Sequence, residues 1–420
     1  MKKALLFLIF IFIFSNIYAG EQKMLKNGIT LIKEKRDYTN TVAVTVFIKG
    51  GVFRENRDNN GVGDLFNVVW LKSNTILEKM EFYGGLINSS VAHDYGEINF
   101  SIITEFSENI LEDFENFILK PKLDDKVFNI EKNIQLNRIK SIKDNANAYA
   151  GEGFNKATYG DFPYGMNMLG TIESVSKLTL DDLKRYYYEM INANDIIVSI
   201  AGNYSDRFLE RLIGIFEKIP QKEQSYKISC EGSEISKDLF IEEEYDRIKQ
   251  AKLFLAYTAP SAASKDYLVL KLLSDIVGGG MSSKYFNILR KEKGYAYAVG
   301  SYYASKLCSS RFVSYIGLQY ENVNDAIAAM EKINKSLKEY ITEDDIVANK
   351  NYILGKILSE AQTNSKVAWY NAFFYNLGLG SDYFSKYIDG IKSITYDDII
   401  KVSELFNEPK TIYILKPRSK

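Results

Sequence analysis

The sequence predicts an α+β protein made of two similar domains, each with helices packed on one face of a mixed or antiparallel sheet. The main observation is a repeat at an offset of about 216 residues, in which residues 176–183 match residues 392–399. A short apolar stretch follows each copy, at 196–200 and at 411–415. A helix and then a strand at the same place in both halves favour duplication over a chance likeness of two helix starts.

Each copy of the repeat begins as a helix would. Thr179 and Thr395 are good N-cap residues, and the Asp pair that follows each stands in the first turn, where the helix dipole favours negative charge. Near the start of each half, residues 41–48 and 252–257 have strand patterns, and a turn and an amphipathic helix follow. The expected order in each half is therefore strand, strand, helix, strands, long helices, strand.

Domain boundaries follow from the repeat. We expect residues 20–216 to form the first domain and residues 239–420 to form the second. The segment between them, residues 217–238, is polar and contains Pro220 and Gly232, which is typical of a linker.

Charge and histidine content exclude several classes of protein. The 53 basic and 54 acidic residues nearly cancel, and no basic stripe is present, so we expect no nucleic-acid partner. His93 is the only histidine, whereas a zinc hydrolase built on a helix needs two His one turn apart. Any Ser-His or Cys-His pair would also have to use His93. A histidine of the surface or the core, without a chemical role, is the favoured interpretation.

The N-terminus has the pattern of an export signal. Lys2 and Lys3 precede an apolar run at residues 4–14, and Ala19 ends a plausible cleavage site. The run has 11 residues, which is short for a membrane span. We therefore expect a cleaved signal peptide at residues 1–19 and a periplasmic or otherwise exported protein, with an uncleaved anchor as the alternative. No second run of this kind follows, so we expect no stable membrane span in the mature chain.

The two cysteines, Cys230 and Cys308, both lie in the second half. An oxidising compartment permits a disulfide between them. Two buried thiols are the alternative, and the sequence leaves the choice open.

Short motifs occur in both halves of the sequence. Those of the first half are GVGDLFNVVWLK at 61–72, YGGLINS at 83–89, a helix at 131–142, YGDFPYG at 159–165 and GTI at 170–172. The second half carries GGGMSSKYFNILR at 278–290 and GYAY at 294–297. The order of these motifs resembles the insulinase and pitrilysin-type zinc peptidases, family M16, which include the subunits of mitochondrial processing peptidase. Those of the second half are similar to the family's GGGxSSRLxxxLR and GLAY. The resemblance covers nearly all of the mature chain and implies two related domains that form half of a clamshell.

The zinc motif of that family, H-x-x-E-H, is degenerate in this chain. Its positions hold Asp64, Asn67 and Val68, and the position of the third ligand, a Glu in the family, holds Arg138. These side chains cannot supply the three ligands and water that a catalytic zinc site needs. We therefore expect no metal in this chain, and a salt bridge from Arg138 to Asp64 in place of the metal.

A second pair of family residues is retained. Arg290 and Tyr297 match an Arg and a Tyr that, by resemblance, help to bind the peptide carbonyl, and both are donors suited to an oxyanion. The alternative is that Arg290 is a solvated helix end and Tyr297 a core residue of a strand.

The resemblance also implies two places where a peptide substrate would bind. One is the glycine loop with Gly279 and Gly280, for which a plain turn between helices is the alternative. The other is an expected edge strand at residues 88–95, with Asn88 and Ser89, to which an extended peptide can add.

The resemblance implies a role as the non-zinc subunit of an exported heterodimeric M16 peptidase. The partner would be an H-x-x-E-H subunit that carries the zinc, or a second copy of this chain. A structural or peptide-binding scaffold of the same fold is the alternative. A peptidase that works alone with a rebuilt metal site is disfavoured by the residues at 64, 67, 68 and 138.

Overall fold

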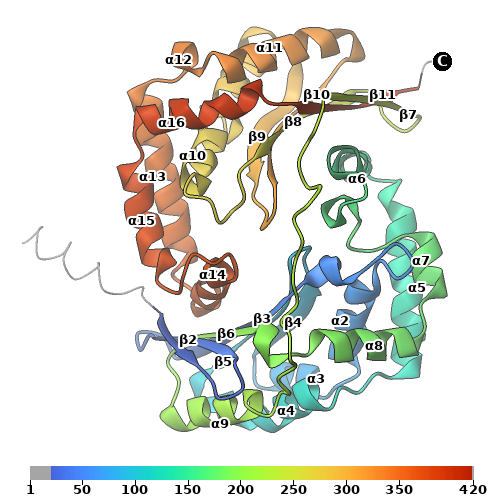
Figure 1. The fold of residues 1–420 in the computed structure, drawn as a ribbon, viewed down its shortest axis with the longest axis vertical. Coiled ribbons are helices and arrows are strands. Elements are labelled where there is room, and N and C mark those ends of the chain that lie inside the picture. Colours follow the sequence, from blue (N-terminus) through green and yellow to red (C-terminus); the bar gives the residue numbers. More distant parts are fainter. Residues whose placement is uncertain (1–19, 419–420) are drawn as a thin grey trace, which may run out of the picture. The chain divides into compact units, whose positions relative to one another are not determined.

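The computed structural model describes residues 20–418, so the predicted signal peptide lies outside the described residues. The chain forms two compact units, each made of three stretches of sequence. Unit 1 contains residues 20–137, 168–228 and 358–389, and unit 2 contains residues 138–167, 229–357 and 390–418. Each unit has its own sheet (Figure 1).

The sheet of unit 1 has the strand order β1-β2-β6-β3-β5-β4. Its β2/β6 pair is parallel and the others are antiparallel, so the sheet is mixed. The strands are β1 (Glu21–Met24), β2 (Thr30–Lys35), β3 (Thr41–Lys49), β4 (Leu86–Val91), β5 (Tyr95–Ile103) and β6 (Ile196–Gly202).

The sheet of unit 2 has the order β7-β11-β8-β10-β9, with a parallel β7/β11 pair and antiparallel pairs elsewhere. This order and these directions repeat β2-β6-β3-β5-β4 of unit 1. The strands are β7 (Leu239–Tyr245), β8 (Ala251–Ala259), β9 (Ala296–Ala304), β10 (Ser310–Leu318) and β11 (Lys410–Pro417). The shared topology confirms the predicted fold class of two similar α+β domains.

Helices cover both sheets. Those of unit 1 are α2 (Val62–Lys72), α3 (Ile76–Phe82), α4 (Leu111–Leu119), α7 (Ile172–Lys177), α8 (Leu180–Met190), α9 (Asp206–Phe216) and α14 (Asn364–Asn376). Those of unit 2 are α6 (Ala146–Tyr159), α10 (Tyr267–Gly278), α11 (Val323–Lys335), α12 (Leu337–Tyr340) and α16 (Tyr396–Val402). A unit boundary falls within α5 (Asp125–Ile142), α13 (Glu343–Glu360) and α15 (Tyr383–Ser393). Within residues 20–418, no helix is both long and apolar enough to cross a bilayer.

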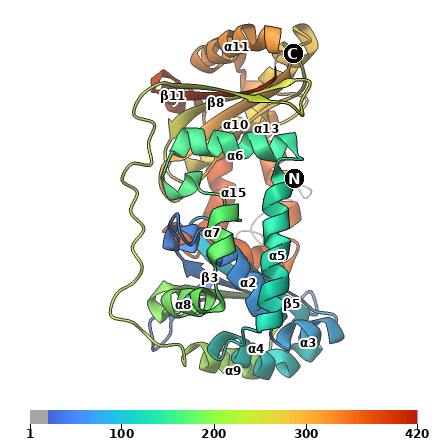
Figure 2. The same ribbon diagram turned by 90° about the vertical axis from the view of Figure 1, so that its right-hand side faces the viewer.

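Each sheet is covered in part by a helix from the other half of the sequence. In unit 1, α14 packs on β3, β6 and β5 (Figure 1). Phe47 of β3 contacts Trp369 of α14, whereas its neighbour Ile48 faces α2 and α8, so the two sets of helices cover opposite faces. In unit 2, α6 packs on β11, β8 and β7 (Figure 2).

The predicted repeat extends to individual hydrogen bonds. Thr179 and Thr395 each cap a helix by a reciprocal pair of bonds with the Asp three residues later, as the sequence predicted. Lys132 of α5 donates to the carbonyl oxygens of Ser176 and Leu178 at 2.8 and 2.7 Å. Lys350 of α13 makes the matching bonds, to the carbonyl oxygens of Lys392 and Ile394.

The segment predicted to be a linker, residues 217–238, forms no helix or strand. The compact units do not follow the sequence halves, because α6 and α14 each lie with the other half's sheet. The predicted domain boundaries at 216 and 239 separate the two copies of the sequence repeat, and they stay predictions.

Helix α6 is held on its sheet by close packing at Gly153. A Cβ on Gly153 would lie 2.0 Å from the Tyr413 hydroxyl, whereas a Cβ on Gly151 would meet nothing within 4 Å. Tyr413 is buried and donates to Glu243 at 2.8 Å, so its ring has little freedom to move. The two glycines therefore differ in what a methyl group would cost, although both are helical.

We predict that Gly153→Ala lowers the free energy of unfolding by about 1–3 kcal/mol, because the added methyl group overpacks the α6 interface. Gly151→Ala is the matched control and should raise the free energy of unfolding by roughly 0.5–1 kcal/mol, the usual gain of Ala over Gly in a helix. Denaturant midpoints of the two variants and the wild type measure both effects. Equal midpoints for the two variants would contradict the packing argument.

Candidate functional site

Helix α2 carries three of the four positions of the family's zinc site, namely two ligands and the general base. It begins after Gly61, whose φ of 91° favours glycine. Asp64 and Val68 lie one turn apart and are half-buried, and Asn67, on the adjoining side of the helix, is buried. Arg138, which stands at the fourth position, is an exposed residue of α5. The predicted salt bridge between Arg138 and Asp64 stays a prediction.

Asn67, at the position of the family's general base, is used for packing. Its side-chain amide donates to the Gly63 carbonyl oxygen at 2.7 Å, and its Oδ1 accepts from the Ser89 hydroxyl of β4. Both ends of the side chain are therefore engaged, and the bond to Ser89 joins α2 to the edge strand. A buried amide with both groups satisfied contributes to stability, and it cannot accept a proton from water as a general base would.

The donor set at these positions does not fit zinc. It consists of one carboxylate, one engaged amide and one alkyl group on α2, with a guanidinium on α5, whereas zinc needs N, S or O ligands without a competing cation. Among residues 20–418, no group of three or more His, Cys, Asp and Glu side chains is placed to hold a metal ion.

The side chain of Glu55 stabilises the start of α2. Its buried carboxylate accepts from the Asn60 side chain at 2.9 Å and from the backbone N–H groups of Gly61 and Gly63 at 2.8 and 3.0 Å. A Cβ on Gly63 would lie 2.7 Å from this carboxylate, which explains the glycine. Burial raises the pKa of Glu55 to about 7, although the three donors oppose this shift.

Arg290 and Tyr297 are in contact. Arg290 belongs to a π-helical segment, Phe286–Glu292, in which Lys293 N–H donates to Ile288 O five residues back at 3.0 Å. Its guanidinium lies 5.2 Å from the ring centre of Tyr297 and 4.8 Å from that of Phe286. Tyr297 is on β9, the edge strand of the unit 2 sheet, and is 80% exposed. The alternative that Tyr297 is a core residue is therefore wrong.

The glycine loop contains two glycines that packing requires and one that it does not. A Cβ on Gly278, the last residue of α10, would lie 2.0 Å from Ser301 N of β9, and one on Gly279 would lie 2.6 Å from Asp275 Cα. A Cβ on Gly280 would meet nothing within 4 Å. The roles of Gly279 and Gly280 in substrate binding stay predictions.

The predicted edge strand is confirmed in place and corrected in extent. Strand β4 spans Leu86–Val91 and ends the sheet of unit 1, with Asn88 exposed and Ser89 turned toward α2. Its predicted end at Tyr95 is wrong, because Ala92 N–H bonds to Tyr95 O and the chain reverses at His93 and Asp94. Tyr95 therefore begins β5, and His93 lies in the turn.

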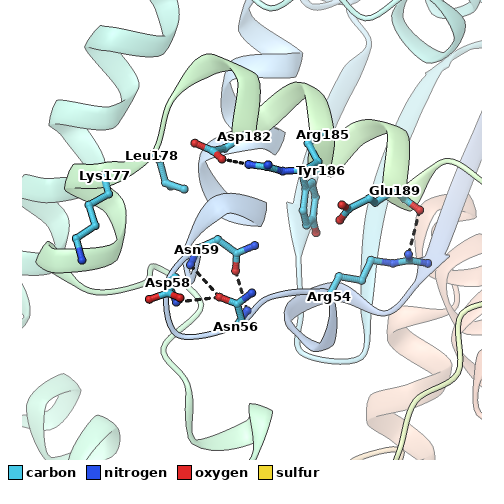
Figure 3. A pocket seen from close by; sticks show the side chains of 10 residues that line it. All are labelled: Arg54, Asn56, Asp58, Asn59, Lys177, Leu178, Asp182, Arg185, Tyr186 and Glu189. Atoms are coloured by element: carbon cyan, nitrogen blue, oxygen red, sulfur yellow. Dashed lines mark hydrogen bonds and ion pairs between the residues drawn. The ribbon is translucent and has the colours of Figure 1, made fainter.

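A polar cavity of about 520 Å³ lies in unit 1 between α8 and the loop before α2 (Figure 3). Arg54 lies at one end, where it donates to Glu189 O at 3.1 Å and to the Asp195 carboxylate at 3.0 Å. Asp182 and Arg185, which are both in α8, form an ion pair at the edge of the cavity. Sequence reasoning missed this cavity because its lining comes from distant segments without a shared motif. The lining residues are Arg54, Asn56, Asp58, Asn59, Lys177, Leu178, Asp182, Arg185, Tyr186 and Glu189.

Comparison with protein families agrees with the sequence motifs. Residues 30–172 match the family described as Insulinase (Peptidase family M16), and residues 177–353 match the Peptidase M16 inactive domain. Together the two matches cover more than half of the chain. The chain belongs to peptidase family M16.

Individual relatives include named proteases and a named non-peptidase. The "Uncharacterized zinc protease YmxG" of Bacillus subtilis is 26% identical over 354 residues, which cover 82% of this chain and 85% of that protein. The "Non-peptidase homolog YmxG" of Helicobacter pylori is 26% identical over 230 residues, 53% of this chain and 52% of that protein. A solved structure of a protease from Helicobacter pylori has a TM-score of 0.86 at 20% identity, covering 95% of this chain and all of that chain. At this identity the likeness shows the fold alone.

We predict that Glu55 makes stability depend on pH. Because its pKa is raised from 4.5 to about 7, protonation favours the folded state. The resulting stabilisation is full below pH about 4.5 and is lost as the pH rises through about 7. Relative to Glu55→Gln, which is uncharged throughout, the wild type should lose about 3 kcal/mol of unfolding free energy over this range. Parallel pH profiles of the two proteins would refute the assignment.

We also predict that the protein, purified alone, holds no stoichiometric zinc and cleaves no peptide, because the three ligand positions and the position of the general base lack a zinc donor set. The positive control restores the family residues in one variant, Asp64→His, Asn67→Glu, Val68→His and Arg138→Glu, which should bind about one zinc per chain. Elemental analysis after gel filtration measures the zinc content of the wild type and of the variant. Equimolar zinc together with chelator-sensitive cleavage in the wild type would overturn this prediction.

Proposed function

We propose that the protein is the non-zinc subunit of an exported heterodimeric M16 peptidase and supplies Arg290 and Tyr297 to bind the peptide carbonyl. The observation that carries the proposal is the contact of Arg290 with Tyr297, which is exposed on the edge strand β9, in a chain whose zinc-site positions hold no zinc donor set. An exposed tyrosine beside an arginine is not needed for the core of unit 2, so its retention favours a role at the surface.

The chemistry of the pair suits acyl transfer. The Tyr297 hydroxyl and the Arg290 N–H groups are hydrogen-bond donors, and the guanidinium stays charged at any physiological pH. Donors of this kind stabilise the negative charge that develops on a carbonyl oxygen under attack. The guanidinium over the Tyr297 ring also restrains the ring by a cation–π contact. The π-helical segment that carries Arg290 is of a type that recurs at functional sites.

The partner in this proposal is an H-x-x-E-H subunit of similar length. Its zinc would supply the Lewis acid and the activated water that this chain lacks. The edge strand β4 with Asn88 and Ser89 and the loop with Gly279 and Gly280 would contact the extended peptide. A pair made of two copies of this chain would contain no zinc site and would be inactive.

Export is supported by two features of the chain. The N-terminal residues have the signal-peptide pattern, and Cys230 and Cys308 are joined in a disulfide with a Cα–Cα distance of 5.2 Å. This pairing decides the choice that the sequence left open. Disulfides persist in exported proteins and are rare in a reducing cytosol, so a periplasmic or extracellular location suits the pair.

A scaffold or peptide-binding protein without a catalytic role is the second candidate. The observation that favours it is the Helicobacter pylori relative named a non-peptidase homolog. The same edge strands would bind a peptide in this case, but neither Arg290 nor Tyr297 would affect turnover in any complex.

We predict that Tyr297→Phe leaves folding and pairing with a zinc subunit intact and lowers turnover of the complex by about 100-fold or more, the usual cost of one lost oxyanion donor. Arg290→Ala should have a similar effect. Tyr302→Phe is the matched control, because Tyr302 is a half-exposed tyrosine on the same strand, and it should retain full turnover. The assay is peptide hydrolysis by the complex reconstituted with the zinc subunit, with assembly checked by gel filtration.

Wild-type turnover in both Tyr297→Phe and Arg290→Ala complexes would show that the pair is not catalytic and would favour the scaffold. Failure of any zinc subunit to pair with the wild-type chain would remove the heterodimer itself.

A further inference from the structure

Part of the connecting segment is buried, although its composition is that of an exposed linker. Ser233 and Ile235 are 3% and 7% exposed. The Ser233 hydroxyl accepts from Ser309 N at 3.3 Å, and Ile235 N donates to the Thr258 hydroxyl of β8 at 3.0 Å. Residues 229–235 therefore lie docked on unit 2.

Arg311 is the centre of this docking site. It is 1% exposed, and all five of its N–H donors find oxygens. The acceptors are Thr158 Oγ1 and Thr158 O of α6, Ser233 O of the segment, and Ser309 Oγ and Ser310 O beside β10, at 2.7–3.2 Å. The guanidinium also lies 4.0 Å from the ring centre of Tyr159. One side chain thus joins α6, the connecting segment and β10.

These oxygen atoms stabilise the positive charge of the buried Arg311 side chain. These five oxygens replace the water that the guanidinium lost on burial. Burial lowers the pKa of Arg311, although the charge of nearby Glu234 acts in the opposite direction. Loss of one acceptor would leave a donor of a buried cation unpaired, which strongly favours opening of the site to water.

The disulfide lies at the entrance to this site. Cys230 stands three residues before Ser233, and Cys308 stands three residues before Arg311. Cys308 is 2% exposed, and its N–H donates to the Tyr164 hydroxyl at 3.0 Å. Cys230 is exposed, so a reductant can reach the bond from that side. The disulfide fixes the segment that supplies Ser233 O to the strand that supplies Arg311.

We propose that the Cys230–Cys308 disulfide and Arg311 form a redox-sensitive latch, which holds residues 229–235 and the C-terminal end of α6 on the sheet of unit 2. A dithiol opens the latch: it gives two electrons and two protons, its own sulfurs pair, and Cys230 and Cys308 become thiols. Residues 229–235 are then held by only a few hydrogen bonds, and these must offset the conformational entropy that the segment gains when it leaves the sheet. Once Ser233 O leaves, Arg311 lacks an acceptor, and its hold on Thr158 of α6 weakens.

The latch goes beyond the proposed function, since it concerns how the chain senses its compartment and does not depend on a zinc partner. In an oxidising compartment α6, a helix of the first half, is fixed on the sheet of the second half. Under reduction the same helix end and the connecting segment loosen while the core strands stay paired.

Hydrogen exchange of the full mature chain, followed by mass spectrometry, tests the proposal. Reduction with dithiothreitol should raise exchange at residues 229–235 and 156–160 by about tenfold or more, with β3 of unit 1 unchanged. Thiol alkylation and intact mass establish that reduction is complete. The Cys230→Ser, Cys308→Ser double variant should exchange as the reduced wild type does, with no further response to dithiothreitol.

Arginine variants test the coupling. Arg311→Lys keeps the charge but cannot reach five acceptors, so it should raise exchange at 229–235 in the oxidised protein and have a smaller effect in the double Ser variant. Arg247→Lys, at an exposed arginine of the same unit, is the matched control and should change nothing at these residues. Unchanged protection of 229–235 after complete reduction would overturn the latch, as would a uniform rise throughout unit 2, which indicates a general stabiliser.

Discussion

Both sheets depend on a helix that must come from the other half of the sequence. A sheet with two apolar faces needs a cover on each, and in both units one of these covers is a helix from the other half of the sequence. In unit 2 the second cover is α6, whose Ala150 and Phe154 pack with Ala256, Val313 and Tyr413. In unit 1 it is α14, whose Trp369 packs on Phe47 and donates to Glu97 at 2.9 Å. The positions of the glycine at 153, of the Arg311 site and of the connecting segment follow from this arrangement.

Loss of the zinc motif has left the helix that carried it well supported. Glu55 caps the turn before α2, Asn67 bonds to the edge strand, and Lys72 pairs with Glu131 of α5 at 2.9 Å. The position of the family's general base has thus become a packing position, whereas Asp64 and Val68 are half-buried and Arg138 is exposed. A chain can therefore keep the family's fold without a zinc donor set at these positions, because stability and chemistry are supplied by separate residues.

Much of the fold could be predicted from local patterns. The caps at Thr179 and Thr395 and the strands at 41–48 and 411–415 were correct because each rests on a few neighbouring residues. The exchange of α6 and α14 could not be predicted, since periodicity shows that a helix face is apolar but not which sheet will cover it. The same limit applies to the site: the motif placed Arg290 and Tyr297 seven residues apart, whereas their contact depends on a π-helical turn that no residue pattern indicates. The disulfide and the polar cavity depend on long-range geometry.

The exchange of helices also constrains how the chain can be made. Unit 1 lacks the cover on one face of its sheet until α14 has been synthesised, and unit 2 lacks strand β11, which lies between β7 and β8, until residues 410–417 have been synthesised. Neither unit can therefore complete its core during translation, and contacts of such long sequence separation form slowly. In the exported protein that we propose, this topology would keep the polypeptide unfolded until it has crossed the membrane, where the cysteines could then be oxidised.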